Sequence, residues 1–173
     1  MKLKELSLQD CEQVRIWRNT CLESLRTPFP LTKEMQEQFY KDVICDRSSK
    51  SKYGGIWVGE SDEIFIGMCG LENIENENRR AEISMIINPE YQGEGYGHQA
   101  VELLFKHGFA WLNLKSIWGE CYQCNSAIEF WEKICHQYKA HTTTIIRTKY
   151  FNDKYYGSLH FTITKEAWEK CHK

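Results

Sequence analysis

Apolar and polar residues alternate in the middle of the chain and then change to a helical spacing. Ile83, Met85 and Ile87 lie at every second position, which is the pattern of a strand with one buried face. Pro89 ends this run, because proline cannot donate a hydrogen bond to a neighbouring strand. Beyond it, apolar residues recur at steps of three and four, which predicts an amphipathic helix with a buried stripe. The stripe consists of Val101, Leu104, Phe105, Gly108, Phe109 and Leu112.

Two further helices are predicted near the N-terminus from residues that can cap them. The side-chain oxygen of a serine or threonine accepts a hydrogen bond from the free N–H groups of a helix's first turn. Ser7, with Asp10 three residues later as in a capping box, predicts one helix that extends to about Arg18. Thr32 predicts a second helix. Its apolar face is expected to contain Met35, Phe39 and Val43.

The segments around these helices are predicted to be irregular or extended. Residues 20–31 contain Pro28 and Pro30 and should be irregular. The glutamate-rich stretch 72–77 predicts a solvated loop. Runs rich in β-branched and aromatic residues, bounded by turn residues, predict strands. These strands are 2–6, 55–59, 64–71, 80–88 and 116–121.

Three alternate glycines join the middle strand to the long helix. Gly93, Gly95 and Gly97 have no Cβ that would keep a ligand away. The free N–H groups and the positive dipole end of a helix N-terminus form an anion site, for which phosphate is the natural ligand. The spacing is Gln92-x-x-Gly95-x-Gly97, so neither G-x-G-x-x-G nor Gly-Lys-Ser/Thr is present. From the glycines alone, a turn without a ligand stays equally open.

That spacing resembles the acetyl-coenzyme A pyrophosphate loop of the GNAT superfamily of N-acetyltransferases. The residues between the strand and the loop, Asn88-Pro89-Glu90-Tyr91, resemble the same family. The resemblance extends to Ala127–Lys133, which is similar to the family's A-x-x-x-Y-E-K pattern. Residues 151–168 resemble the closing hairpin and tail of the branch that contains ribosomal-protein and amino-sugar acetyltransferases. Trp17-Arg18-Asn19 is similar to a signature that borders the acceptor pocket in that branch, although Trp17 could simply pack in the core.

The resemblance implies a fold and an activity. It implies one acetyltransferase domain over residues 1–173, of the α/β (α+β) class, with a mixed, mostly antiparallel sheet of about seven strands flanked by helices. Two splayed parallel strands would border the coenzyme. The implied activity is transfer of an acetyl group from acetyl-CoA to a primary amine of a small molecule or a protein N-terminus. An acyltransferase with another acyl group, a non-catalytic coenzyme A-binding module and a homodimer all stay open.

The resemblance also implies which residues contact the coenzyme. Asn125 takes a coenzyme-contacting position only after a one-residue register change and could instead cap the short helix. Trp131 stands where the family usually has a tyrosine that protonates the leaving thiolate, and an indole N–H donates a hydrogen bond without titrating. The implied pantetheine contacts are Met85, Ile86 and Ile87, and the implied pyrophosphate contacts are Gln92, Gly93, Glu94, Gly95, Tyr96, Gly97 and His98.

A general base is expected beside the splayed strands, because acetyl transfer needs a neutral amine. By resemblance, Glu120, at the cleft end of the strand 116–121, is one candidate, and Glu82 on the partner strand is the other. Burial among apolar neighbours makes a carboxylate a stronger base. Either glutamate could equally be a structural ion-pair partner.

Composition and charge narrow the partners. The chain has 42% hydrophobic and 27% charged residues with a net charge of −2, which argues against nucleic acid and leaves a cationic acceptor open. Its N-terminus lacks an apolar signal core and no run could span a membrane, so a cytoplasmic protein is expected. The eight cysteines are then expected to be reduced thiols. Cys121 and Cys124 form a C-x-x-C without a second ligand pair, so no metal is expected.

Overall fold

The strands of the protein form one sheet in the computed structural model, which describes residues 1–27 and 29–172. The strands are β1 (Lys2–Lys4), β2 (Lys52–Val58), β3 (Ile64–Glu75), β4 (Arg80–Ile87), β5 (Ser116–Tyr122), β6 (His141–Phe151) and β7 (Lys154–Thr164). Their order is β1-β2-β3-β4-β5-β7-β6. β4 and β5 pair in parallel and the other neighbours pair antiparallel. The predicted mixed, mostly antiparallel sheet of seven strands is confirmed.

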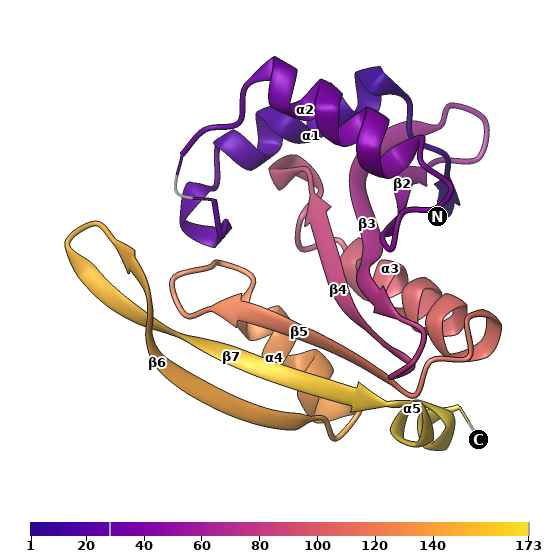
Figure 1. Ribbon diagram of the computed structural model, residues 1–173, viewed down its shortest axis with the longest axis vertical. Coiled ribbons are helices and arrows are strands. Elements are labelled where there is room, and N and C mark those ends of the chain that lie inside the picture. The colour runs from indigo at the N-terminus through magenta and orange to yellow at the C-terminus, as the bar shows by residue number, and fades with distance from the viewer. Residues whose placement is uncertain (28, 173) are drawn as a thin grey trace.

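Helices cover both faces of the sheet (Figure 1). They are α1 (Leu8–Asn19), α2 (Lys33–Phe39), α3 (Tyr96–Phe105), α4 (Ile128–Gln137) and α5 (Lys165–Cys171). Both predicted caps are present, since Ser7 and Asp10 form a capping box and Thr32 accepts a hydrogen bond from Met35 N. Two helices continue as π-helical turns, α2 over Tyr40–Ile44 and α3 over Lys106–Trp111. Pro28, in the segment predicted to be irregular, lies outside the described residues.

Two apolar cores lie on opposite faces of the sheet. The main core joins the sheet to α3 and α4, with Leu71, Phe105 and Ile117 among its fully buried residues. The second core joins the sheet to α1 and consists of Leu6, Cys11, Val14, Trp17 and Met68. Both faces of β4 are buried at Ala81, Glu82 and Ile83, whereas on β5 buried residues alternate with partly exposed ones.

Three sequence predictions are wrong in detail. Leu112 is 39% exposed, because it follows a π-helical turn that changes the helical spacing on which the stripe was based. Met35 is 41% exposed and its neighbour Gln36 is 3% exposed, so a polar residue takes the buried position in α2. The predicted loop 72–77 begins late, because β3 extends to Glu75. Within this extension of β3, Glu72 accepts a hydrogen bond from the hydroxyl of Tyr53 on β2.

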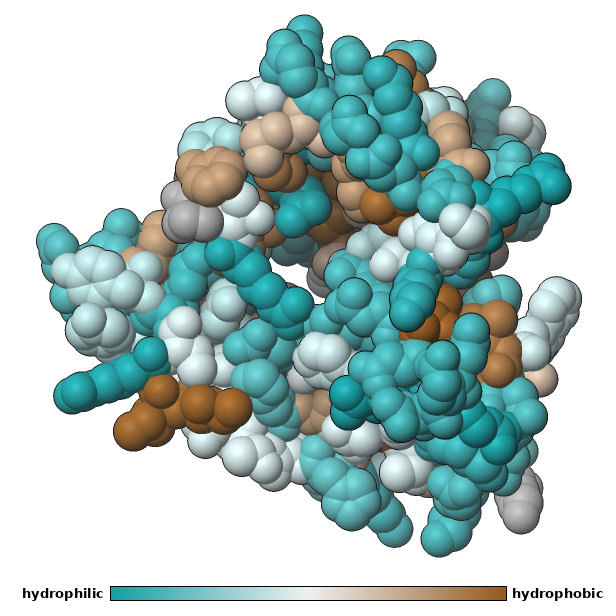
Figure 2. Space-filling view, viewed as in Figure 1, coloured by the Kyte–Doolittle hydropathy of each residue, from teal (hydrophilic) through white to brown (hydrophobic). Residues whose placement is uncertain are grey.

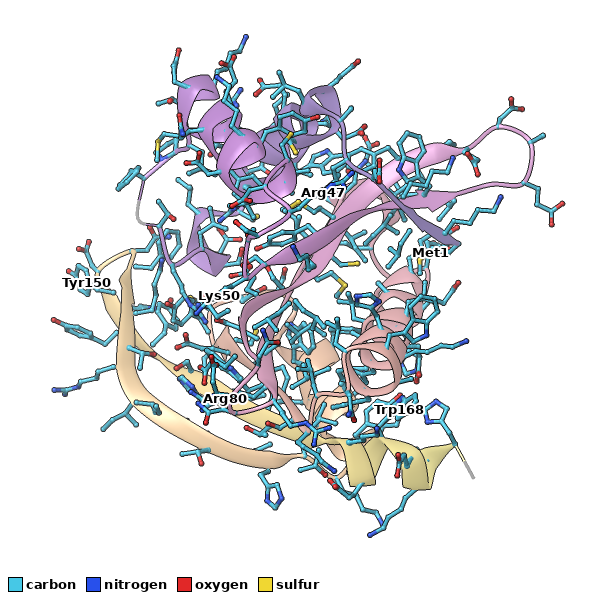
Figure 3. The ribbon with its side chains drawn as sticks, turned by 45° about the vertical axis from the view of Figure 1, so that its right-hand side comes forward. Met1, Arg47, Lys50, Arg80, Tyr150 and Trp168 are labelled. Atoms are coloured by element: carbon cyan, nitrogen blue, oxygen red, sulfur yellow. The ribbon has the colours of Figure 1, made fainter. Side chains whose placement is uncertain are left out.

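The β6–β7 hairpin projects beyond the rest of the sheet (Figure 1). Its turn, Asn152 and Asp153, has φ angles of 47° and 56°, which asparagine and aspartate adopt more readily than other non-glycine residues. Tyr150 is 58% exposed and lies near the tip of this hairpin (Figure 3). Among residues 1–27 and 29–172, no helix combines the length and the apolar character that crossing a membrane requires.

Gly119 in the middle of β5 is expected to be a packing-critical position. A Cβ at Gly119 would lie 2.4 Å from Phe161 Cζ, and Phe161 is 2% exposed and stacked on Trp131. Gly119→Ala should therefore lower the free energy of unfolding by about 1 to 3 kcal/mol. At Gly54 in β2 the nearest atom to an added Cβ is 3.4 Å away, so Gly54→Ala is the control. Equal urea midpoints for the two variants would contradict this prediction.

Candidate active site

The sheet opens between β4 and β5. Their register covers only the pairs from Arg80–Ser116 to Glu82–Trp118, whereas β5 stays paired with β7 as far as Tyr122. Figure 1 shows β4 and β5 diverging beyond this point, and the surface is hollowed between the upper and lower halves of the molecule (Figure 2). The β5-facing edge of β4 beyond Glu82, which includes the predicted contacts 85–87, is therefore available to a ligand that offers amide groups.

The glycine loop leads from the end of β4 into the N-terminus of α3. Gly93 and Gly95 have φ angles of 85° and 81°, which L side chains rarely adopt. A Cβ built on either would meet nothing within 4 Å, so the space in front of the loop is open. At Gly97 a Cβ would lie 3.2 Å from Phe130, so this glycine lets α3 approach α4. The loop thus combines open space with the N–H groups of a helix start.

Other predicted loop contacts serve the loop itself or face solvent. Gln92 Nε2 donates to the carbonyl of Ile87 at 3.0 Å, which fixes the loop to the strand end. Glu94 is exposed, and Tyr96 packs partly against the main core. His98 is exposed, with its Nε2 3.8 Å from Glu102. An anion at this loop would therefore be held mainly by backbone N–H groups.

The two candidate bases lie together inside the opening, where Arg26 bridges them. Glu82 is 4% exposed, and Arg26 Nη2 donates to its Oε1. Arg26 Nε donates to Glu120 Oε2 at 3.2 Å. The remaining oxygens have partners too, since Asn73 Nδ2 donates to Glu82 Oε2 at 3.3 Å and His160 Nε2 lies 3.1 Å from Glu120 Oε1. All four carboxylate oxygens are engaged.

The guanidinium of Arg26 is the positive charge that the two carboxylates share. Burial opposes this charge, but the hydrogen bond to Glu82 and the charges of Glu82 and Glu120 outweigh it and raise the pKa of Arg26. Burial and the charge of Glu120 also raise the pKa of Tyr122, so its phenol stays protonated near neutral pH. The Arg26 side chain is 50% exposed, against 6% for Glu82 and 13% for Glu120. The guanidinium therefore covers the carboxylates on their solvent side.

The cluster continues onto β7 and β6. His160 is paired with Glu120 in the β5–β7 register, and its Nε2 also lies 3.1 Å from Ser158 Oγ. Thr148 Oγ1 donates to Ser158 Oγ at 3.0 Å. His160 therefore places an imidazole nitrogen between Glu120 and the Ser158 hydroxyl.

The predicted residues Asn125 and Trp131 lie after β5 in the chain. Asn125 Oδ1 accepts from Ala127 N at 2.8 Å, which stabilises the turn before α4. Trp131 belongs to the main core, is 9% exposed, and its ring stacks on Phe161 with centroids 5.0 Å apart. Contact of either residue with a coenzyme stays a prediction.

A separate groove of about 820 Å³ follows α1. Its lining includes Gln9, Gln13, Trp17, Thr20, Phe65 and Tyr91. Trp17 is 8% exposed and stacks on Phe65 with ring centroids 5.4 Å apart, so the interpretation that it packs in the core is confirmed. The described lining of this groove does not include Glu82 or Glu120. We therefore assign the chemistry to the opening between β4 and β5.

Arg26 and His160 belong to the cluster but were not predicted. On β7, Ser158, His160 and Thr162 lie opposite Tyr122, Glu120 and Trp118, so their alternation as polar residues could have placed His160 beside Glu120. Arg26 lies in an irregular segment, where no periodicity indicates the direction of a side chain.

Three features are typical of coenzyme A-dependent acyltransferases: a sheet that opens between parallel strands, a glycine loop at a helix N-terminus beside that opening, and carboxylates inside it. The family described as acetyltransferase (GNAT) domain matches residues 1–129. The chain belongs to the GNAT acetyltransferase family.

Two relatives are 31% identical to this chain over the aligned residues. An uncharacterized N-acetyltransferase p20 from Bacillus licheniformis is 31% identical over 120 residues, which cover 68% of this chain and 67% of that protein. The spermidine N(1)-acetyltransferase of Escherichia coli K12 is 31% identical over 121 residues, which cover 68% of this chain and 62% of that protein. The match therefore spans less than two thirds of the Escherichia coli enzyme.

The fold is similar to solved structures of the spermidine N-acetyltransferase from Vibrio cholerae. Its complex with CoA and spermine has a TM-score of 0.79 at 19% identity, covering 97% of each chain. Its dodecameric structure has a TM-score of 0.76 at 21% identity, covering 96% of this chain and 95% of that one. At these identities the likeness establishes the fold.

These comparisons decide several of the sequence predictions. The predicted family, the fold and the reaction class, acetyl transfer to an amine by an N-acetyltransferase, are confirmed. The family uses acetyl-CoA as its acetyl donor. The individual contacts and the base that the resemblance implied stay predictions.

Proposed function

We propose that the protein acetylates a primary amine of a small polycationic acceptor, such as a polyamine, with acetyl-coenzyme A as the donor. The observation that carries this proposal is the meeting of Glu82 and Glu120 in the opening, where they exceed the charge of Arg26 by one. An ammonium group has three donors and no acceptor, so carboxylates are its natural partners. The spermidine N(1)-acetyltransferase of Escherichia coli, to which the chain is related, supports the same acceptor class.

The residues proposed to hold the coenzyme fit its chemistry. The open space at Gly93 and Gly95, beside the N-terminus of α3, suits a pyrophosphate. The edge of β4 at residues 85–87 suits the amides of pantetheine. When bound, the coenzyme supplies an activated acetyl group, and the chain's own task is to orient the amine and to remove its proton.

Proton removal is assigned to the strand carboxylates. We assign the base to Glu120 or Glu82, or to a water that one of them holds, because both lie where the parallel strands separate. His160 could accept the proton from Glu120, 3.1 Å away. The buried Trp131 is assigned a role in shape, because an indole does not titrate near neutral pH.

Incubation of the protein with acetyl-coenzyme A and an amine panel is expected to acetylate polyamines in preference to other amines. The panel contains polyamines, a monoamine, amino sugars, aminoglycosides and peptides with free N-termini, and mass spectrometry identifies each product. Reactions without protein and without acetyl-coenzyme A are the controls. Exclusive acetylation of peptides would contradict the polyamine assignment. Coenzyme binding without any product would favour the non-catalytic module.

Assembly and location complete the proposal. The dodecameric structure of the Vibrio cholerae protein makes an oligomer the expected state of this chain, and light scattering would measure it. A cytoplasmic location agrees with thiols that are free at all eight cysteines, and cell fractionation would test it.

A further inference from the structure

We propose that Arg26 is an internal cation that every acceptor must displace. The two carboxylates that its guanidinium leaves then favour acceptors that carry at least two ammonium groups. The inference rests on the proposed function, because it concerns the same two carboxylates. It adds a residue that sets how tightly any acceptor binds, which the presence of the carboxylates alone does not supply.

The contacts of Arg26 define what its departure would release. It engages one oxygen of Glu82 and one oxygen of Glu120, while the other two oxygens keep Asn73 and His160 as partners. Without Arg26, two buried carboxylates would each present one unpaired oxygen to the same space. Such a pair is costly unless cations replace the guanidinium. The vacated position is therefore a site for positive charge.

The backbone next to Arg26 is anchored at Leu25, and the side chain of Arg26 is at the surface. Lys149 Nζ, from β6, donates to the carbonyl of Leu25. With its side chain 50% exposed, Arg26 can turn to solvent while this anchor holds the preceding residue.

The charge balance distinguishes one ammonium from two. A monoamine exchanges one cation for another, and it competes with a tethered guanidinium whose effective concentration is on the order of millimolar or more. Once Arg26 has left, Glu82 and Glu120 carry two negative charges. A dication restores both ion pairs, whereas a monocation restores one. Displacement of Arg26 therefore weakens the binding of every acceptor equally, and the carboxylate pair that it uncovers favours polyamines over monoamines.

Kinetics of Arg26 variants test the displacement. For Arg26→Met, which keeps the length of the side chain and removes its charge, KM should fall about tenfold or more for both spermidine and propylamine, because the competing cation is gone, while the ratio of their kcat/KM values stays near that of the wild type. Arg26→Lys keeps a tethered cation and should keep both KM values near those of the wild type. Arg47→Met, which removes an exposed arginine on the α2–β2 loop, should leave both KM values unchanged.

A measurement independent of turnover follows Arg26 itself. Its Nε–H resonance is assigned by its loss in the Arg26→Met spectrum and observed in wild-type protein loaded with coenzyme A. Spermidine should shift this resonance towards the value of a solvated arginine, and propylamine at the same concentration should shift it much less. If spermidine saturates the protein by calorimetry and leaves the resonance in place, the displacement is refuted.

The outcomes separate this inference from the proposed function. If wild-type protein acetylates no amine, the proposed function fails, and the resonance still shows whether a polyamine displaces Arg26. If Arg26→Met lowers kcat for both amines and leaves both KM values unchanged, Arg26 only positions the carboxylates and the inference is overturned. If Arg26→Met does not fold, Arg26→Gln replaces it in the kinetic test, and its spectrum supplies the assignment.

Discussion

Replacing Gly95 by valine is expected to abolish coenzyme A binding while the protein stays folded. Gly95 precedes the first turn of α3 with a φ of 81°, and a Cβ there would project into space with no atom within 4 Å. A valine would fill the position assigned to the pyrophosphate and would strain the turn that aims the N–H groups. Calorimetric titration with coenzyme A should show affinity at least about 100-fold weaker than that of the wild type.

The control for this variant is a valine on a loop without an assigned ligand. Ser61 is exposed in the turn between β2 and β3, so Ser61→Val should bind coenzyme A like the wild type. Urea unfolding should show that Gly95→Val retains a cooperative transition. Unchanged affinity of a folded Gly95→Val variant would remove the glycine loop from the coenzyme site.

The elements around this loop were predictable because their signals are local. The alternation before Pro89 corresponds to β4, which ends at Ile87. The apolar stripe that begins at Val101 corresponds to α3, and its residues up to Phe109 are buried. Caps at Ser7 and Thr32 act through hydrogen bonds to residues three positions away. Short-range patterns of this kind determine where an element begins, whatever packs against it.

The remaining details depend on contacts between distant residues. A π-helical turn shifts the spacing after Phe105 and leaves Leu112 at the surface. The glutamates that follow Leu71 suggested a loop, but pairing of Glu72 with Glu82 across β3 and β4 keeps the strand intact. Neither effect has a signature within a few residues. Tertiary pairing therefore overrode the local composition.

The site was predictable only in part for the same reason. Glu82 and Glu120 were candidates because resemblance to a family assigned functions to the two strands that carry them. Arg26 reaches Glu120 across 94 positions of the sequence, from a segment without regular structure. Because of Arg26, each carboxylate has two assigned roles: it is an ion-pair partner of Arg26 and a candidate base.

Glutamine at position 120 or 82 is expected to separate these two roles. Glu120→Gln keeps the shape and removes the base, so kcat/KM for the acceptor should fall roughly 10²- to 10⁴-fold with coenzyme A binding intact if Glu120 serves. The same loss in Glu82→Gln would assign the base to Glu82. Trp131→Phe should cost much less, because the buried indole contributes shape. Steady-state rates with saturating acetyl-coenzyme A measure all three variants.

A control variant at the surface and the pH dependence of the activity complete this test. Glu77 is exposed in the turn after β3, so Glu77→Gln should keep wild-type kinetics. Unfolding curves must show that the two glutamine variants fold, because each removes one partner of an ion pair with Arg26. If Glu120→Gln and Glu82→Gln both fold and both retain nearly full activity from about pH 6 to about pH 9, the acceptor loses its proton to solvent before it binds. The carboxylates would then serve only to attract and hold the cation.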